Sequence, residues 1–250
     1  MSTTMNVKPY YVDDNVTIYN ADHRDILPHL IGIDMVFTSP PYNLGTSTHG
    51  RSGMHSGSLA AKNLAGGYRT YSDDMPQREY DLWQTETVTQ LWNTLSDNGA
   101  IFYNHKPRIQ NGECKLPTDY GAELPLRQII TWDRGTGMNF SSSFFLPKSE
   151  WIVVWAKPAF KLTDKSASQI GDVWHIPPET ADDHPAPFPL KLPATAIAAT
   201  TANTILDPYA GSGTTLLAAR NLGRKAIGIE LDERYCEIAA NRLAQMALAL

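Results

Sequence analysis

The segment from residue 204 to residue 230 places a strand, a glycine-rich turn, a helix and a second strand in direct succession. The runs 204–207 and 225–230 are apolar and predict two buried strands, and the turn after the first carries Gly211 and Gly213. A helix predicted over 214–221 connects the two strands. A helical crossover of this kind joins parallel strands. The segment therefore restricts the chain to α/β folds.

The same alternation of strands and helices extends over most of the chain. Asn98-Gly99 is predicted to end the helix that begins at residue 79, and the proline-rich segment 157–190 is predicted to be mostly irregular. We expect one Rossmann-like α/β domain over 1–250, with a mostly parallel sheet and helices on both faces. The further predicted strands are 16–19, 33–38, 100–104, 126–132 and 151–155, and the further predicted helices are 79–95, 192–201 and 233–249.

Cysteine usage and hydropathy favour a cytoplasmic protein without a structural metal. Cys114 and Cys236 are far apart and form no CxxC pair, so neither a disulfide framework nor a zinc site is predicted. A membrane-spanning helix needs a run of about 18 apolar residues, and no such run occurs. The polar first residues do not resemble a signal peptide. The net charge of −5 leaves nucleic acid open as a partner, because binding depends on local patches.

The glycine-rich turn predicts a site for a ligand that carries a carboxylate and a ribose. Gly211 and Gly213 allow the backbone to approach a ligand closely, and the start of the following helix offers free N–H groups to a carboxylate. Glu230 ends the next strand, where it can accept hydrogen bonds from ribose hydroxyls. The third glycine of the dinucleotide fingerprint and the Gly-Lys-Ser/Thr of a phosphate-binding loop are both absent.

A second turn, Thr38-Ser39-Pro40-Pro41-Tyr42-Asn43, predicts chemistry on an exocyclic amine. The prolines end the preceding strand, so the Pro40 carbonyl can point into a cleft beside the Ser39 hydroxyl. Two such acceptors would favour a pyramidal amine whose lone pair attacks a methyl sulfonium, and they stabilise the charge that develops on the nitrogen. Tyr42 offers a flat face on which a flipped base can stack. This chemistry requires neither a covalent enzyme intermediate nor a metal.

Four segments together resemble the amino-methyltransferases, which use S-adenosylmethionine to methylate exocyclic amines of DNA bases. Ser39-Pro40-Pro41-Tyr42 resembles the catalytic motif of the family, and Asp207 to Thr215 resembles its methionine-binding motif. Ala226 to Asp232 is similar to the ribose-binding segment, and His184 to Pro189 is similar to a motif that closes over the methionine moiety. The resemblance implies S-adenosylmethionine as the cofactor, double-stranded DNA as the substrate and the class I methyltransferase fold.

The resemblance also implies roles for individual residues. Ser39, Pro40, Pro41 and Tyr42 would be the catalytic group. Asp22 fits the acid that contacts the cofactor's adenine, and it fits a helix cap as well. The implied cofactor-binding residues are Asp22, Thr38, His184, Pro185, Asp207, Tyr209, Ala210, Gly211, Ser212, Gly213, Thr214, Thr215, Glu230 and Leu231.

The first residue of the catalytic motif bears on the target base. Family members with Ser at this position are mostly cytosine-N4 enzymes, and those with Asp or Asn are mostly adenine-N6 enzymes, so Ser39 favours cytosine N4 and leaves adenine N6 as the alternative. The Cys-Pro nucleophile of carbon-5 enzymes is absent. An RNA or small-molecule substrate and an inactive DNA-binding module are further alternatives. The intact Ser39, Tyr42, Gly211, Gly213 and Glu230 argue against the inactive module.

The catalytic motif precedes the cofactor motif, which resembles the circularly permuted β-type arrangement of the family. Target recognition is expected between the two motifs, in a reduced region over 135–175 and in a loop over 44–70, which lacks acidic residues. Segments 104–108 and 130–135 resemble family segments that line the base pocket. By analogy with relatives, a homodimer and a cognate restriction nuclease stay open as partners. The candidate DNA-contacting residues are Arg51, Lys62, Arg69, Lys106 and Arg108.

Overall fold

A nine-stranded sheet forms the centre of the molecule, as seen in a computed structural model that describes residues 7–43, 75–110, 112–137, 142–179 and 188–247. Its strand order is β1-β2-β11-β10-β3-β4-β8-β7-β9. The strands are β1 (Tyr11–Val12), β2 (Val16–Asn20), β3 (Ile33–Thr38), β4 (Leu95–His105), β7 (Leu126–Asp133), β8 (Ser149–Ala156), β9 (Val173–His175), β10 (Thr204–Asp207) and β11 (Lys225–Glu230), and a separate hairpin contains β5 (Arg108–Gln110) and β6 (Glu113–Lys115).

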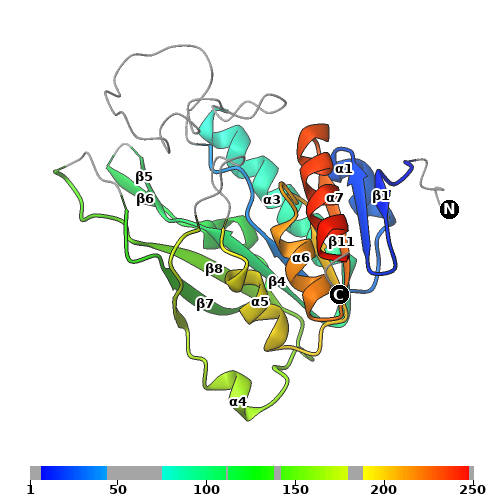
Figure 1. Cartoon of the computed structure of the whole chain (residues 1–250). Helices are drawn as coiled ribbons and strands as arrows, with labels where there is room; N and C mark the ends of the chain where they lie inside the picture. The colour runs from blue at the N-terminus through cyan, green and yellow to red at the C-terminus, as the bar shows by residue number, and fades with distance from the viewer. Residues whose placement is uncertain (1–6, 44–74, 111, 138–141, 180–187, 248–250) are drawn as a thin grey trace.

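Five neighbouring strands of the sheet, β2, β11, β10, β3 and β4, are parallel to one another. Strand β8 is antiparallel to both β4 and β7, β1 is antiparallel to β2, and β9 is parallel to β7. The antiparallel pairings lie at the two sides of the parallel centre (Figure 1). The mostly parallel α/β sheet predicted from the sequence is confirmed.

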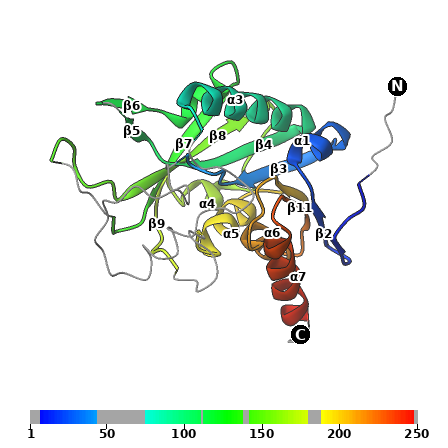
Figure 2. The ribbon, with the colours of Figure 1, turned by 90° about the horizontal axis from the view of Figure 1, so that it is seen from above.

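Helices cover both faces of this sheet (Figure 2). On one face, α3 packs Tyr80, Val88 and Leu91 into a core that includes Ile101 and Trp155. The other face buries its apolar side chains beneath α5, α6 and α7. The helices are α1 (His23–Ile26), α3 (Gln77–Thr94), α4 (Lys165–Ser168), α5 (Lys191–Ala198), α6 (Thr214–Asn221) and α7 (Glu233–Ala247), with 3-10 turns η1 (Leu27–His29) and η2 (Pro117–Gly121).

The carboxyl ends of the parallel strands meet at one edge of the sheet, which we call the carboxyl edge. The strand ends Glu230, Asp207 and Thr38 lie there, because parallel pairing aligns the direction of every strand. Antiparallel β8 begins at this same edge, since Trp151 pairs with His105 at the end of β4. Ligand sites of open parallel sheets lie outside this edge.

Four predicted elements have the observed boundaries, but others differ: the helix predicted over 192–201 ends at Ala198, and the strand predicted over 100–104 begins at Leu95. The predicted ranges of β3, β10, α6 and β11 agree with the structure. Asn98-Gly99 does not end the first long helix: α3 ends at Thr94, and both residues lie inside β4. The strand passes so close to β3 that a Cβ on Gly99 would stand 2.8 Å from the Ile33 carbonyl oxygen. Gly99 therefore permits close strand pairing rather than a helix stop.

Part of the segment predicted to be irregular is ordered. Between residues 157 and 179 the structure contains α4 and β9. Trp174 in β9 is buried in the core, and its Nε1 donates to the Gly171 carbonyl at 3.0 Å. A three-residue strand leaves too short a pattern to detect among prolines. Within the described residues, none of the helices has the length and apolar character needed to cross a membrane.

Candidate functional site

Asp207 lies buried at the end of β10 and joins the two turns singled out by the sequence. Its Oδ1 accepts hydrogen bonds from Thr38 Oγ1 at 2.8 Å and from the Tyr209 amide at 3.1 Å. Its Oδ2 is buried and has no hydrogen-bond partner among the described residues. Burial raises the pKa of the Asp207 carboxyl to about 6. A buried acceptor left open in this way fits a ligand that brings a donor or a cation.

The glycine-rich turn holds the carboxylate of Glu230 with its backbone. The Gly211 amide donates to Glu230 Oε2 at 2.9 Å, and the Asp232 amide donates to Oε1 at 2.8 Å. Gly213 precedes α6 with a φ of 80°, and a Cβ there would stand 2.8 Å from the Cβ of Ala239. Only glycine suits that backbone conformation at that distance from α7. The turn and the acid thus form one rigid unit beside the start of α6.

Asp22 acts as the cap of α1 in this structure. Its carboxylate accepts from the Arg24 amide at 2.9 Å and forms an ion pair with the Arg24 guanidinium. The hydrogen bond from the Arg24 side chain is the main cause of the lowered pKa of Asp22. Asn20 Nδ2 donates to the carbonyls of Glu230 and Leu231, both at 3.1 Å, which places the ends of β2 and β11 side by side. The helix-cap interpretation is therefore confirmed, and contact with an adenine stays a prediction.

The Ser39 turn leaves the carboxyl end of β3 with its later carbonyls held by side chains. Tyr80 donates to the Pro41 carbonyl at 2.7 Å, and Arg108 NH1 donates to the Tyr42 carbonyl. The carbonyl of buried Pro40 accepts no hydrogen bond from any described residue. The hydrogen bonds from Tyr80 and Arg108 thus hold the turn in place. They leave open the Pro40 carbonyl, which the sequence predicted to face a ligand.

Ser39 and Tyr42 belong to a polar network that reaches β4 and β8. The Ser39 and Tyr42 hydroxyls lie 2.9 Å apart, and the Tyr42 hydroxyl donates to Glu150 Oε2 at 2.9 Å. Asn104 Nδ2 lies 3.3 Å from Ser39 Oγ, 2.9 Å from the Tyr42 hydroxyl and 3.0 Å from Glu150 Oε2. Arg134 NH1 completes the network at 3.1 Å from Glu150 Oε1. The network gathers acceptors and donors from β4, from β8 and from the residue after β7, behind the Ser39 hydroxyl.

Sequence reasoning missed Glu150. The residue stands directly before the apolar run 151–155, so its carboxylate is buried to 6% exposure at the start of β8. A single acid beside a strongly apolar strand could have indicated this residue, because a carboxylate is rarely buried without an ion pair, hydrogen bonds or a functional role. Asn104 and Arg134 lie in the two segments that resemble base-pocket segments. Asn104 contacts Ser39 directly, and Arg134 joins the same network through Glu150.

His105 packs against Tyr42 as a neutral ring. The two ring centroids are 4.5 Å apart, and His105 Nε2 lies 2.9 Å from the Tyr80 hydroxyl. Burial lowers the pKa of His105 to about 3, so the imidazole carries no charge near neutral pH. The His105 ring therefore packs against Tyr42 at a tilt of 42° and brings no charge to it.

Both turns lie in a region that matches a known protein family. A sequence model of the family described as DNA methylase, which covers N6 and N4 enzymes, matches residues 33–241. The match spans both turns and most of the chain. The chain belongs to the N6/N4 DNA methylase family.

A relative in sequence is a type II methyltransferase, and solved structures share the fold. The type II methyltransferase M2.MboI of Moraxella bovis is 28% identical over 270 residues, which cover 98% of this methylase and 94% of the relative. A cytosine-N4-specific PvuII DNA methyltransferase shares the fold with a TM-score of 0.70 at 19% identity, covering 94% of this chain and 88% of that one. A complex of M1.HpyAVI with S-adenosylmethionine has a TM-score of 0.60 at 21% identity, covering 91% and 99% of the two chains.

Several predicted residues of the methylase gather at the carboxyl edge, and others cannot be placed. The hydrogen bonds given above join these residues in three pairs: Thr38 with Asp207, Ser39 with Tyr42, and Gly211 with Glu230. Lys106 lies near Tyr42, with Nζ 5.7 Å from the centre of the Tyr42 ring. Arg51, Lys62, Arg69, His184, Pro185 and the loop over 44–70 lie outside the described residues.

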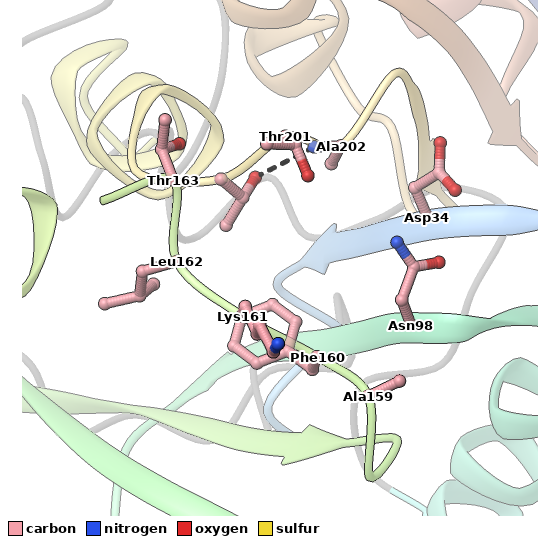
Figure 3. A pocket seen from close by; sticks show the side chains of 10 residues that line it. Asp34, Asn98, Ala159, Phe160, Lys161, Leu162, Thr163, Thr201 and Ala202 are labelled. Atoms are coloured by element: carbon pink, nitrogen blue, oxygen red, sulfur yellow. Dashed lines mark hydrogen bonds between the residues drawn. The ribbon is translucent and has the colours of Figure 1, made fainter. Parts of the chain in front are cut away.

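A pocket at the opposite edge of the sheet lacks this chemistry (Figure 3). Asp34, Asn98 and the segment Ala159 to Thr163 line it, near the start of β3. Both carboxylate oxygens of Asp34 already accept hydrogen bonds, from Ser96 and from the amides of Asn203 and Thr204. Asp34 therefore ties strand starts together, and the pocket is not the methylase active site.

Proposed function

We propose that this methylase transfers a methyl group from S-adenosylmethionine to the N4 amine of a flipped cytosine in double-stranded DNA. The observation that carries the proposal is the 2.8 Å hydrogen bond between Thr38 and Asp207. Thr38 precedes Ser39, and Asp207 begins the glycine-rich turn, so this bond joins the amine site to the cofactor site. Direct transfer requires donor and acceptor to be held in line at such a junction.

The residues of the glycine-rich turn fit S-adenosylmethionine. The start of α6 suits the carboxylate of the methionine moiety, and the open Asp207 Oδ2 suits a donor such as its ammonium. Each Glu230 oxygen accepts one amide and keeps lone-pair capacity for a ribose hydroxyl. Leu231, 46% exposed beside Glu230, offers an apolar surface to the adenine. When bound, the cofactor supplies the sulfonium methyl.

Ser39 and Pro40 would prepare the amine for attack. The lone pair of an exocyclic amine is delocalised into the aromatic ring, which makes the nitrogen a poor nucleophile. Acceptance of its two N–H groups by Ser39 Oγ and the unpaired Pro40 carbonyl would favour a pyramidal nitrogen. The Tyr42 ring, supported by His105, would hold the base plane. These two acceptors, already in place before the reaction, would also stabilise the positive charge that develops on the nitrogen during transfer.

The choice of cytosine over adenine rests on Ser39. Serine at the first position of this motif resembles cytosine-N4 enzymes, and the PvuII enzyme that shares the fold is cytosine-N4-specific. Adenine N6 is the alternative, since the family includes enzymes of both kinds.

The DNA is proposed to approach the carboxyl edge. Asp133 pairs with Ser149, so the connection between β7 and β8 leaves the sheet beside Glu150, and it carries Phe145 at 99% exposure. An exposed aromatic side chain there suits contact with bases or with the gap left by a flipped one. Within the predicted recognition region over 135–175, residues 135–137 and 142–148 belong to this connection, so we propose that these residues contact the DNA.

Mass spectrometry of nucleosides tests the proposal directly. Unmethylated DNAs of varied sequence are incubated with the full chain and S-adenosylmethionine, and N4-methylcytosine is the expected product. N6-methyladenine would overturn the base assignment and keep the transfer chemistry. The absence of any methylated nucleoside, with a folded chain that binds the cofactor, would overturn the proposed reaction.

A further inference from the structure

Glu150 is a buried carboxylate that is surrounded by donors directly behind Ser39. Oε1 pairs with Arg134 at 3.1 Å, and Oε2 receives the Tyr42 hydroxyl at 2.9 Å and Asn104 Nδ2 at 3.0 Å. An ionised carboxylate can only accept hydrogen bonds. Its charge therefore dictates which way the hydrogens of its neighbours point.

The direction of the hydrogen bonds follows from counting the hydrogens. Tyr42 has one hydroxyl hydrogen, and the Glu150 carboxylate at 2.9 Å takes it in preference to the neutral Asn104 carbonyl at 3.5 Å. At the 2.9 Å contact between Ser39 and Tyr42, the donor must then be the Ser39 hydroxyl. Burial, followed by the nearby Glu150 charge, raises the pKa of Tyr42 well above its usual value, so the phenol keeps its proton. Ser39 is left with its hydrogen directed inward. Asn104 Nδ2, 3.3 Å from Ser39 Oγ, takes at most one of the two lone pairs, so the other can accept from the target amine.

We propose that Glu150, held by Arg134, is a positioning residue that makes Ser39 a hydrogen-bond acceptor toward the target amine. The inference deepens the proposed function and rests on it. Without the carboxylate, the Tyr42 hydroxyl can turn and donate to Ser39. The Ser39 hydrogen would then face the amine nitrogen and occupy the lone pair that has to attack the methyl group. The charge of Glu150 thus acts on the reaction through Tyr42 and Ser39.

Asn104 supports the same orientation. Its Nδ2 faces the three oxygens of the network, and its Oδ1 is buried without a partner in the described part of the chain. Contact of Nδ2 with Glu150 prevents the amide from turning over, because two acceptors would then face each other.

The variant Glu150→Gln tests the inference in the full chain. A glutamine that presents its oxygen to Arg134 presents its NH₂ group to Tyr42, which reverses the hydrogen bonds that lead to Ser39. We expect the single-turnover methylation rate to fall by about 10²-fold, the scale of one pre-oriented active-site hydrogen bond. Affinities for S-adenosylmethionine and for DNA should change by less than about twofold. Tyr103→Phe is the matched control, because it removes another buried tyrosine hydroxyl, which donates to Gln84 outside this network.

A double-mutant cycle separates positioning from a general structural effect. Because Glu150 is proposed to act through Ser39, Glu150→Gln should cost little further rate in a Ser39→Ala background. If the wild type methylates DNA, either of two results would overturn the inference and keep the proposed function. One is full activity of Glu150→Gln, and the other is a double variant whose rate loss is the product of the two single losses. If Glu150→Gln does not fold, Tyr42→Phe breaks the same chain and should show the same non-additivity with Ser39→Ala. A folded wild type that methylates nothing would overturn the proposed function as well.

Discussion

Ser39 makes its side-chain hydrogen bonds only within the polar network, as far as the described residues show. Its hydroxyl does not touch the glycine-rich turn, whereas its neighbour Thr38 does. At the scale of single residues, the proposed function therefore places cofactor binding and methyl transfer on the adjacent side chains Thr38 and Ser39. This separation makes the roles of individual residues measurable.

Ser39→Ala should reduce methyl transfer and leave cofactor affinity nearly unchanged. The substitution removes one amine acceptor, so we expect the single-turnover rate to fall by about 10²-fold to 10³-fold. Calorimetric titration with S-adenosylmethionine and single-turnover methylation would check the two halves of the prediction. A Ser39→Ala variant that methylates normally but binds the cofactor poorly would contradict the assigned roles.

Asp207 should make cofactor affinity dependent on pH. Burial raises its pKa from 3.8 to about 6, so the cofactor-free fold holds this proton more tightly than the unfolded chain does. The stability from this effect is complete below pH 3.8 and is lost as the pH rises through about 6. A cationic ligand needs the ionised form, so affinity for S-adenosylmethionine should weaken by up to about tenfold per unit below pH 6. Titrations that give equal affinity at about pH 5 and about pH 7 would contradict this role.

At the scale of elements, glycine and proline explain which boundaries could be predicted. Pro40 and Pro41 end β3 after Thr38, and the turn with Gly211 and Gly213 separates β10 from α6, as the sequence indicated. The end of α3 could not be read in the same way, because Gly99 serves the contact between β4 and β3. A glycine in the sequence can mark a turn, but it can also lie within a strand whose neighbour is too close to leave room for a Cβ.

Substitution at Gly213 should disturb the junction of α6 and α7. Gly213→Ala combines a positive φ with a Cβ 2.8 Å from that of Ala239, and we expect a loss of about 1–3 kcal/mol in the free energy of unfolding and weaker cofactor binding. Gly213→Arg should abolish cofactor binding. Gly223→Ala is the matched control, since Gly223 has a φ of 68° with nothing within 4 Å of its built Cβ. Equal effects at Gly213 and Gly223 in urea unfolding would assign the cost to backbone strain alone.

At the scale of the whole molecule, the two edges of the sheet differ in chemistry. The carboxyl edge carries both turns, the polar network and the cations Lys106 and Arg108. The opposite edge carries strand starts and the pocket that includes Lys161 (Figure 3). The Arg108 guanidinium donates to the Tyr42 carbonyl. A predicted contact of Arg108 with DNA would therefore use the N–H groups of the guanidinium that this bond leaves over.

Charge reversal at the two edges should separate DNA binding from net charge. Lys106→Glu is expected to weaken DNA binding by about tenfold at low salt and to reduce the salt slope by about one. Lys161→Glu changes the net charge equally at the opposite edge and should leave affinity within about twofold. Fluorescence anisotropy with a labelled duplex at several salt concentrations measures both. A stronger effect of Lys161→Glu would contradict approach of DNA to the carboxyl edge.

The sequence by itself determined the α/β class, most of the parallel strands and both turns of the candidate site. These features are local: an apolar run, a proline pair or a glycine-rich turn carries its signal within a few residues. Only the tertiary structure decided that Glu150, Arg134 and Asn104 meet behind Ser39. Glu150 lies on β8, Arg134 follows β7, and Asn104 lies on β4. The antiparallel pairing of these three strands brings the residues to one edge of the sheet. Side-chain contacts between strands depend on their register, and register is set by packing across the whole sheet rather than by any one segment.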